Sequence, residues 1–238
     1  MRAGDVIRVT SAVENYAEND PERIFPVAIH SNNAGVVLGS LQDFLPPHFT
    51  HQFFNEDGLA IGGYIGSVPG SSFISNPKIT IQRLKSNGDI ALNPSFLATI
   101  GNGVLSSMPK ISIQADANYF APTSGLFLHT EVEKIDAGLT NELATVVYLL
   151  EDSIIAPQEL LGNVLDEEYI HRNVMRGCID HKPFGQKLDA AHMAANGKYY
   201  FNYSYKLPNQ YNPDNMHLLI YVYDKVTNEI YQVIKHEL

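Results

Sequence analysis

A change in the spacing of the apolar residues after residue 107 is the feature that most constrains the fold of this chain. Just before that point, Leu97, Ile100 and Val104 recur three or four residues apart, which is the period of one helix face. From residue 111 to residue 117, apolar and polar residues alternate, which is the period of a half-exposed strand. The sequence therefore predicts a first part that contains helices and a second part built mainly from strands.

The first part carries patterns that are typical of α/β organisation. Its first helix is predicted from the helical spacing of Val6, Val9 and Val13, and its last helix from Asn93-Pro94, an N-cap residue followed by a first-turn proline. The expected elements are a helix over 6–16 that breaks at Asn19-Asp20-Pro21, a buried strand over 24–29, a helix over about 46–54, short strands over 72–74 and 78–84, a turn over 85–89 and a helix over 94–105.

The second part is predicted to be an antiparallel β-sandwich, because short alternating strands follow one another with turns between them. The expected strands cover residues 111–117, 126–135, 143–150, 171–179, 199–206, 216–223 and 230–236. The last two strands flank a hairpin loop over residues 224–229, in which Asn228 can adopt a positive φ. We expect an α+β chain with its domain boundary between residues 107 and 108.

Composition excludes some classes of function. Sixteen basic and 26 acidic side chains give a formal charge of −10, which is the wrong sign for a protein that binds nucleic acid. No apolar run reaches the roughly 20 residues of a membrane-spanning helix. The one cysteine, Cys178, excludes a disulfide or a CxxC pair within these residues, and we interpret it as a buried thiol.

Three candidate sites have both a functional and a structural interpretation, and the structural one is favoured for each. Cys178 could act with His171 or His181 as nucleophile and base, but residues of one strand do not converge on one point. His48 and His51 have the i, i+3 spacing of two metal ligands, but a third ligand is missing, and we expect no metal. The glycine-rich residues 58–70 lack a phosphate-binding motif, and we expect the glycines to permit tight turns.

Two further groups are more suggestive. Glu151, Asp152, His171 and Arg176 could form a ligand or ion site, or a polar network that fixes the crossover at residues 154–158, and pairing of opposite charges favours the network. In the aromatic strand over 199–206, alternate residues face opposite sides. The side that carries Tyr203 and Tyr205 is predicted to be core, with an outward surface for a sugar or a protein as the alternative.

Several segments resemble a known family. They are LLEDSIIAPQ at residues 149–158, EYIHRNVMRG at 168–177 and LIYVYDKVTNEIYQVIKHEL at 219–238. Their order and spacing resemble the 28-kDa outer membrane protein family of the Bacteroidetes. The glycine step from Gly185 to Leu188 and the pair Gln232-Val233 belong to the same resemblance. In the first part, FPVAIHSN at 25–32 and Val68-Pro69 look like the second strand and the cis-proline loop of a thioredoxin-like domain.

The resemblance implies a thioredoxin-like α/β domain over residues 1–107 and an Ig-like or jelly-roll-type β-sandwich over residues 108–238. Members of the family usually begin with a strand and a Cys-x-x-Cys-Pro-like segment. Met1-Arg2-Ala3 stands in that place here, so the strand and the segment are expected to be missing.

The implied function is that of an exported, non-enzymatic envelope protein at the outer membrane or cell surface, with a role in binding, adhesion or structure. No catalytic residue, cofactor or metal is expected. The partner would be an unknown protein or glycan, and a lipid anchor outside this chain could hold it at the membrane. The alternatives are a thiol oxidoreductase whose cysteines lie upstream of this chain, and a carbohydrate-binding module.

Overall fold

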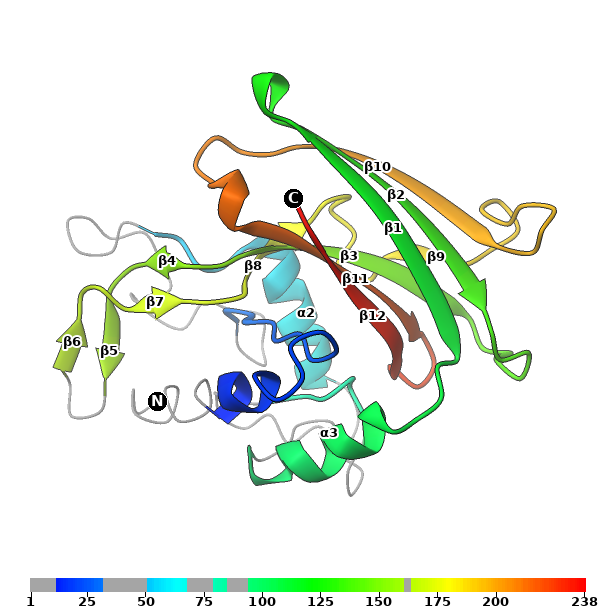
Figure 1. Cartoon of the computed structure of the whole chain (residues 1–238), viewed down its shortest axis with the longest axis horizontal. Coiled ribbons are helices and arrows are strands. Elements are labelled where there is room, and N and C mark those ends of the chain that lie inside the picture. The colour runs from blue at the N-terminus through cyan, green and yellow to red at the C-terminus, as the bar shows by residue number, and fades with distance from the viewer. Residues whose placement is uncertain (1–11, 32–50, 68–78, 85–93, 161–163) are drawn as a thin grey trace. The chain divides into compact units, whose positions relative to one another are not determined.

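A computed structural model describes residues 12–31, 51–67, 79–84, 94–160 and 164–238 (Figure 1). The chain divides into two compact units. Unit 1 comprises Met1–Ser107 and Asp152–Arg176, and unit 2 comprises Met108–Glu151 and Gly177–Leu238. The change of unit after Ser107 falls where the spacing of the apolar residues changes, and residues 152–176 return to unit 1 from within the β-rich part of the sequence.

Helices form the first segments of unit 1. Residues 12–17 are helical and end in a turn over 18–20, as the Asn19-Asp20-Pro21 break predicts. The next helices are α2 (Glu56–Ser67), the 3-10 turn η2 (Pro94–Phe96) and α3 (Leu97–Leu105). The last two cover the predicted helix over 94–105. Tyr16 packs against Gly101 of α3, where an added Cβ would lie 2.1 Å from the tyrosine hydroxyl, and that hydroxyl donates to Asn102 Oδ1 at 3.1 Å.

Helix α2 lies where the sequence predicted turns. Asn55 caps its first turn, because its side-chain oxygen accepts from the backbone N–H of Gly58 at 2.8 Å. Glu56 and Asp57 follow in the first turn, where negative charge suits the helix dipole. The predicted helix over 46–54 is therefore wrong for its described part, since residues 51–55 are non-helical and the helix begins at Glu56.

Two strands predicted in the first part are wrong. Residues 24–29 form no strand, and only Ala28 pairs, through a parallel bridge to Val174. Pro26 lacks the N–H that a ladder needs, which limits pairing to the residues beyond it. Of the strand predicted over 78–84, Ile79 forms only a bridge, and residues 81–83 form a bend and a turn with positive φ at Gln82 and Arg83. The strand over 72–74, the turn over 85–89 and the Val68-Pro69 loop lie outside the described residues.

The remainder of unit 1 consists of short antiparallel pairs. Strand β4 (Ile154–Ile155) pairs with β7 (Ile170–His171), and β5 (Gln158–Leu160) pairs with β6 (Val164–Asp166). The single strand predicted over 171–179 is divided, because Asn173 has a φ of 51° between β7 and β8 (Val174–Cys178). Strand β8 begins in unit 1 and ends in unit 2.

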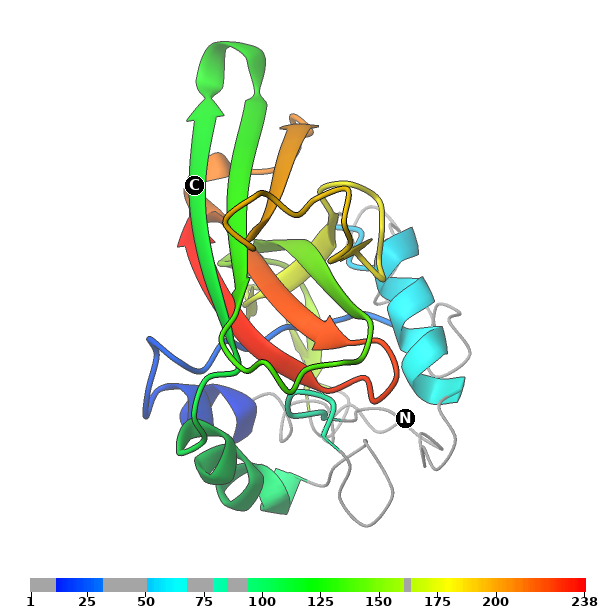
Figure 2. The same cartoon turned by 90° about the vertical axis from the view of Figure 1, so that its right-hand side faces the viewer.

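Unit 2 contains the strands predicted for the second part outside residues 171–179, and the short strand β9, which was not predicted. They are β1 (Ile111–Phe120), β2 (Gly125–Lys134), β3 (Leu143–Glu151), β9 (Gln186–Lys187), β10 (Tyr199–Lys206), β11 (Met216–Asp224) and β12 (Ile230–Glu237), with 3-10 turns η3 (Ala121–Thr123) and η4 (Pro213–Asn215). One antiparallel sheet has the order β1-β2-β10, and Figure 2 shows β1 and β2 as a long hairpin. The other has the order β12-β11-β3-β8, with β9 paired to β3.

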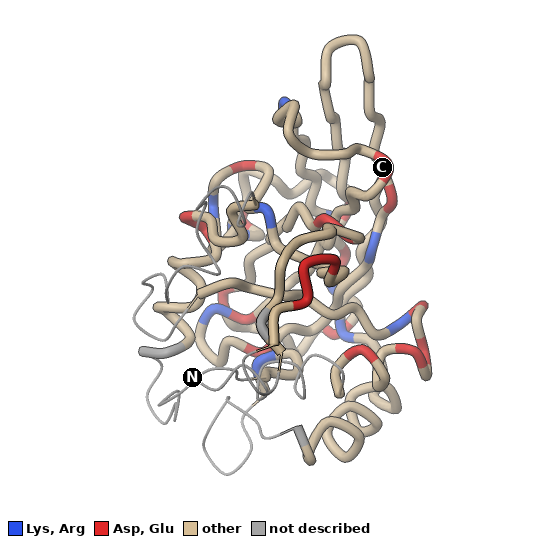
Figure 3. Tube along the Cα trace, turned by 90° about the vertical axis from the view of Figure 1, so that its left-hand side faces the viewer, with Lys and Arg blue, Asp and Glu red and all other residues tan. Residues whose placement is uncertain are grey.

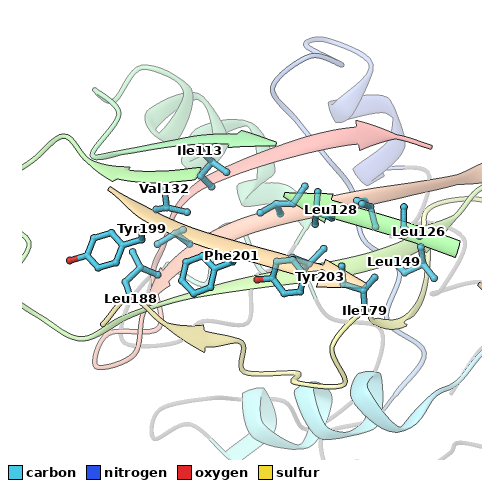
Figure 4. Packing of buried hydrophobic residues seen from close by; sticks show 14 of the residues in the cluster. Ile113, Leu126, Leu128, Val132, Leu149, Ile179, Leu188, Tyr199, Phe201 and Tyr203 are labelled. Atoms are coloured by element: carbon cyan, nitrogen blue, oxygen red, sulfur yellow. The ribbon is translucent and has the colours of Figure 1, made fainter. Parts of the chain in front are cut away.

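The two sheets of unit 2 share one hydrophobic core, seen from close by in Figure 4. The inward residues of β1, β2 and β10 meet those of β3 and β11. Leu126, Leu218 and Ile220 are fully buried within it. Strands β3 and β11 are buried along their whole length, as expected for central strands covered on both faces.

Asp224 organises the last hairpin. Its Oδ1 accepts from the backbone N–H groups of Val226 and Thr227 at 2.7 and 2.9 Å, and Asn228 takes a φ of 68°, as predicted. In fold class, the described chain consists mainly of antiparallel sheets with few helices. None of the helices in the described ranges has the length and apolar character needed to cross a bilayer.

Candidate binding face

The sheet β1-β2-β10 has one face that points away from the core of unit 2. Alternation along the strands defines it, because each inward residue is followed by an outward one. The register gives three rows of outward residues along the middle of the strands. They are Gln114, Glu131 and Tyr200; Asp116, His129 and Asn202; and Asn118, Phe127 and Ser204. A further row at the ends of the strands carries Phe120, Gly125 and Lys206. We call the surface formed by these four rows the outer face.

Aromatic rings lie at two places on the outer face. Near the hairpin end, Phe120 and Phe127 are about half exposed and meet edge to face, with their centroids 5.7 Å apart. Further along β2, the rings of His129 and Tyr200 stack, also 5.7 Å apart. Exposed aromatic side chains in contact with one another offer planar apolar surface to a ligand.

Hydrogen bonds hold the polar side chains of the outer face. His129 Nδ1 lies 2.7 Å from Asn202 Oδ1, so the ring nitrogen donates to the amide oxygen. Asn196 Nδ2 donates to the hydroxyl of Tyr200 at 2.8 Å. The ammonium of Lys198 contacts Glu131, and hydrogen bonds from Lys198 and Tyr200 lower the pKa of Glu131. These contacts fix the orientation of side chains that would otherwise be free.

Charge is sparse on this surface. Residues 117–128, which form the end of the β1–β2 hairpin, include no charged residue, and Figure 3 draws that end without blue or red. Lys198 lies between two acids, because it also pairs with Glu133 at 3.3 Å. The outer face therefore presents aromatic, amide and hydroxyl groups, with the charged side chains of Asp116, Glu131 and Lys206 among them, and it gathers no cluster of one sign.

The aromatic strand predicted over 199–206 is β10. Tyr203 is buried and Tyr205 partly buried, which confirms that their side of the strand is core. The hydroxyl of Tyr203 has no hydrogen-bond partner among the described residues, and burial raises its pKa. The side open to a ligand is the other one, which carries Tyr200, Asn202 and Ser204.

A second aromatic group lies inside unit 1. The ring of Phe53 contacts His30 and His171, with centroids 4.9 and 4.4 Å apart, and the guanidinium of Arg176 lies 5.9 Å from its centroid. Burial lowers the pKa of His30 to about 3, and repulsion from His171 and Arg176 adds to the effect. Burial likewise lowers the pKa of His171 to about 4. Neutral, packed imidazoles are expected of a structural core.

Two residues of the predicted polar set of Glu151, Asp152, His171 and Arg176 lie beside one ring, because His171 and Arg176 both lie against Phe53. Asp152 lies 3.9 Å from Arg172, and Arg176 donates to the backbone carbonyl of Gln52 at 2.7 Å. His171 Nε2 donates to the carbonyl of Ala156 at 3.2 Å, opposite Ile154 in the β4–β7 pair. His171 thus holds the crossover at 154–158, which is the structural role proposed for the set. Glu151 is buried at the end of β3 in unit 2.

The remaining sequence candidates are Cys178 with its histidines, the pair His48 and His51, and the glycine-rich residues 58–70. Cys178 is buried and forms no disulfide, and His181 lies near the ring of Tyr205. His51 lies near Phe53, and His48 is outside the described residues. The expectation that the glycines of 58–70 form turns is wrong up to residue 67, where they belong to α2.

Histidine, cysteine, aspartate and glutamate side chains are the usual protein ligands of a metal ion. Within the described ranges, no three His, Cys, Asp or Glu side chains are grouped so that they could hold a metal ion. The three histidines near Phe53 pack against its ring, and two of them have pKa values lowered by burial.

The sequence patterns did not predict that aromatic side chains gather on the outer face or around Phe53. His129 and Phe127 were within a predicted strand, but only the register with β1 and β10 shows which residues lie beside them. The signal that could have found the outer face was the alternation of β2 itself, which puts Phe127 and His129 opposite the apolar Leu126 and Leu128. Phe53 meets residues more than 100 positions away, which no local pattern reveals.

Comparison with known proteins gives the following. A family model described as outer membrane protein Omp28 matches residues 73–238, and no curated protein matches. HBP35 of Porphyromonas gingivalis is similar in structure, with 15% identity and a TM-score of 0.58, over 75% of this chain and 58% of that one. A domain of the outer membrane lipoprotein Omp28 from Porphyromonas gingivalis has 20% identity and a TM-score of 0.39, over 56% of this chain and 90% of that domain. This chain thus spans less than two thirds of the length of HBP35.

Proposed function

Because this chain belongs to the outer membrane protein Omp28 family and is a protein of the cell envelope, we propose that it acts there by binding a partner through the outer face of β1-β2-β10. The observation that carries the proposal is the composition of that face. Phe120, Phe127, His129 and Tyr200 are clustered on one regular surface, and the polar groups between them are held in place. Such a surface suits recognition, because side chains that are already held in place lose little conformational entropy when a partner binds.

The proposal includes a non-catalytic role. A catalytic site brings a nucleophile or base within hydrogen-bond reach of its partner, usually in a concave pocket. On the outer face, the polar side chains pair with one another across flat strands. In unit 1, His30 and His171 have pKa values near 3 and 4, too low for a general base at neutral pH.

The finer description of the fold is part of the same proposal. Two antiparallel sheets around one core support a β-sandwich for unit 2. A thioredoxin-like origin of residues 1–107 is supported by the helices of unit 1 and by the parallel bridge between Ala28 and Val174. A lipid anchor outside this chain, and adhesion as the biological outcome, complete the proposal.

Blocking the outer face tests the proposed function. The native Cys178 is buried, so a cysteine introduced on the surface can be labelled selectively with a bulky maleimide under native conditions. Asn202→Cys puts the label at the centre of the outer face, and Val226→Cys puts it on the exposed hairpin loop as a matched control. Attachment of the full chain is measured on surfaces coated with mucin, collagen, fibronectin or Bacteroidetes outer-membrane vesicles.

We expect the unlabelled protein to attach to at least one of these surfaces. Labelled Asn202→Cys should lose most of that attachment, and labelled Val226→Cys should keep it. Equal attachment by both labelled proteins, or attachment to none of the surfaces, would overturn the proposed function. Circular dichroism of each labelled protein checks that the sheets remain folded.

A further inference from the structure

We infer that the ligand of the outer face is a neutral glycan, an inference that rests on the proposed function and specifies its partner. Three properties of the face carry it. They are the hydrogen-bonding groups on its strands, the position of its aromatic rings and the balance of its charges. Each property separates a glycan from the other classes of partner that an envelope protein meets.

The hydrogen-bonding groups of the outer face are mostly short amides and hydroxyls. Asn118, Ser204, Asn202 and Gln114 lie in the three rows that cross the strands. Amide groups both donate and accept, and hydroxyl groups do the same. A sugar presents neighbouring hydroxyls with the same double capacity, so a row of such side chains matches a hydroxyl-rich ligand in every orientation of its hydrogens.

The aromatic rings are placed for stacking at two points. Phe127 and the Tyr200–His129 pair lie on the same face. Tyr200 lies opposite Glu131, and Glu131 is four residues further along β2 than Phe127. At about 3.3 Å per residue, the two points are about 13 Å apart along the strand. Sugar rings carry apolar C–H faces that pack on aromatic rings, and an extended chain of a few units can reach both points.

The charge of the face argues for a neutral ligand. Lys198 is enclosed by Glu131 and Glu133, so its positive charge is already balanced. Residues 117–128 are uncharged, Asp116 is the acidic side chain of the middle row, and Lys206 is the one basic side chain of the four rows. An anionic glycan, a phosphate surface or a nucleic acid would need unpaired cations here, and the described strands do not offer a cluster of them.

A protein partner fits the composition less well. Hot spots between proteins are enriched in Trp, Tyr and Arg, and the centre of such an interface is apolar. The outer rows of β1, β2 and β10 contain no arginine and no aliphatic side chain. Their aromatic rings are separated by amides and hydroxyls, which leaves no continuous apolar centre.

Polar side chains of the face are ordered before the ligand arrives. The bonds from His129 to Asn202 and from Asn196 to Tyr200 fix the central residues. Fixed groups lose less conformational entropy on binding. A short, shallow site of this kind is expected to bind one oligosaccharide weakly and to gain strength when several copies meet a repetitive glycan.

Immobilised glycans provide the test. The full chain is applied to an array of neutral oligosaccharides and polysaccharides, namely glucans, mannans, galactans and chitin oligosaccharides. Sulfated and sialylated glycans, collagen, fibronectin and anionic lipid vesicles are included as separate probes. The variants are Tyr200→Ala, Asn202→Ala and Tyr200→Phe, and the matched control is Phe184→Ala, an exposed aromatic elsewhere in unit 2. Titration calorimetry with the best neutral oligosaccharide then gives the Kd.

The expected result is binding to at least one neutral glycan, reduced at least tenfold by Tyr200→Ala and by Asn202→Ala and unchanged by Phe184→Ala. Tyr200→Phe should keep most of the affinity, because the ring that stacks is retained. Glycan binding that ignores the outer-face variants, or no neutral glycan binding at all, would overturn the inference. Variant-sensitive binding to collagen, fibronectin, vesicles or anionic glycans alone would also overturn it, yet the proposed binding function would stand.

Discussion

Both units of the molecule contain a histidine packed on an aromatic ring, but the surroundings of the two pairs are opposite. In unit 1, His171 and Phe53 are buried, and burial lowers the pKa of His171 to about 4. In unit 2, His129 stacks on Tyr200 on the exposed side of a sheet and bonds to Asn202. The same pair of residue types supports a core in one unit and offers a surface in the other.

Under the proposed function, exposure, rather than residue type, decides which of the two groups recognises a ligand. An enclosed ring contributes to stability through the surface it buries and the contacts it makes. An exposed ring contributes little to stability, so its presence on a regular polar face calls for another explanation. If the comparison is right, substitutions in unit 1 should affect stability and substitutions on the outer face should affect binding.

The largest effect on stability is expected from Phe53→Ala. Phe53 is 3% exposed and is surrounded by His30, His171 and the core residue Ile154, so the substitution leaves a cavity. We expect a loss of about 3–5 kcal/mol in the free energy of unfolding of unit 1. Phe127→Ala, at a ring that is 49% exposed, should cost less than about 1 kcal/mol. Urea unfolding, followed by hydrogen exchange in each unit, measures both, and equal losses would break the comparison.

The second effect is a pH dependence of unit 1. His30 and His171 have pKa values of about 3 and about 4 in the folded chain, below the ordinary 6.5. At a pH between the folded pKa and 6.5, the unfolded chain therefore binds more protons than the folded chain does. The contribution of these neutral histidines to the free energy of unfolding is complete above pH 6.5 and is lost as the pH falls through 6.5 towards 4. At pH 5, each histidine should cost on the order of 2 kcal/mol relative to pH 7.

The variant that isolates this effect is His171→Gln, which keeps a donor for the carbonyl of Ala156. Between pH 7 and pH 5, the variant should lose roughly 2 kcal/mol less than the wild type in urea unfolding. Parallel stability curves for the two proteins over that range would show that the histidine is not held neutral by burial.

A smaller effect is expected at two glycines of α3. Gly101→Ala would bring a Cβ to 2.1 Å from the Tyr16 hydroxyl, so the contact between the two helices must open, at a cost of about 1–3 kcal/mol. Gly103→Ala meets no atom within 4 Å and should instead stabilise by about 0.5–1 kcal/mol, because alanine favours the helix. Thermal unfolding of both variants tests the packing of unit 1, and a stable Gly101→Ala protein would contradict it.

The smallest effect is expected within β10, where the two sides of one strand can be compared. Tyr203→Phe removes a buried hydroxyl that lacks a hydrogen-bond partner, so the free energy of unfolding should stay the same or rise by up to about 1 kcal/mol. Its glycan binding should equal that of the wild type, since Tyr203 faces the core. A clear loss of stability would show that the hydroxyl is hydrogen-bonded, and a loss of binding would move the site away from the outer face.

The second part of the fold was largely predictable from the sequence, for a physical reason. Strands such as β1 and β10 have one buried and one exposed face, so alternation of apolar and polar residues marks them. The first part was harder. The apolar run at 24–29 reads as a strand but makes one bridge, and the glycines of α2 concealed a helix whose start is marked by Asn55.

The candidate site was predictable in its strand but not in its members. Alternation alone divides β10 into two sides, and the sequence left open which side was exposed. The ring that stacks on Tyr200, that of His129, comes from β2, some 70 residues earlier in the chain, and register across strands is set by packing rather than by local pattern. Phe53 and His171 illustrate the same limit in unit 1.

Footprinting of side chains in the bound state tests the central claim most directly. The full chain is exposed to hydroxyl radicals alone and on the coated surface or glycan to which it attaches best, and oxidation of each aromatic side chain is quantified by mass spectrometry. The account predicts protection of Phe120, Phe127 and Tyr200, with Phe96 and Phe184 unchanged, because only the former lie on the outer face. Unchanged oxidation of the outer face, with protection elsewhere, would contradict it.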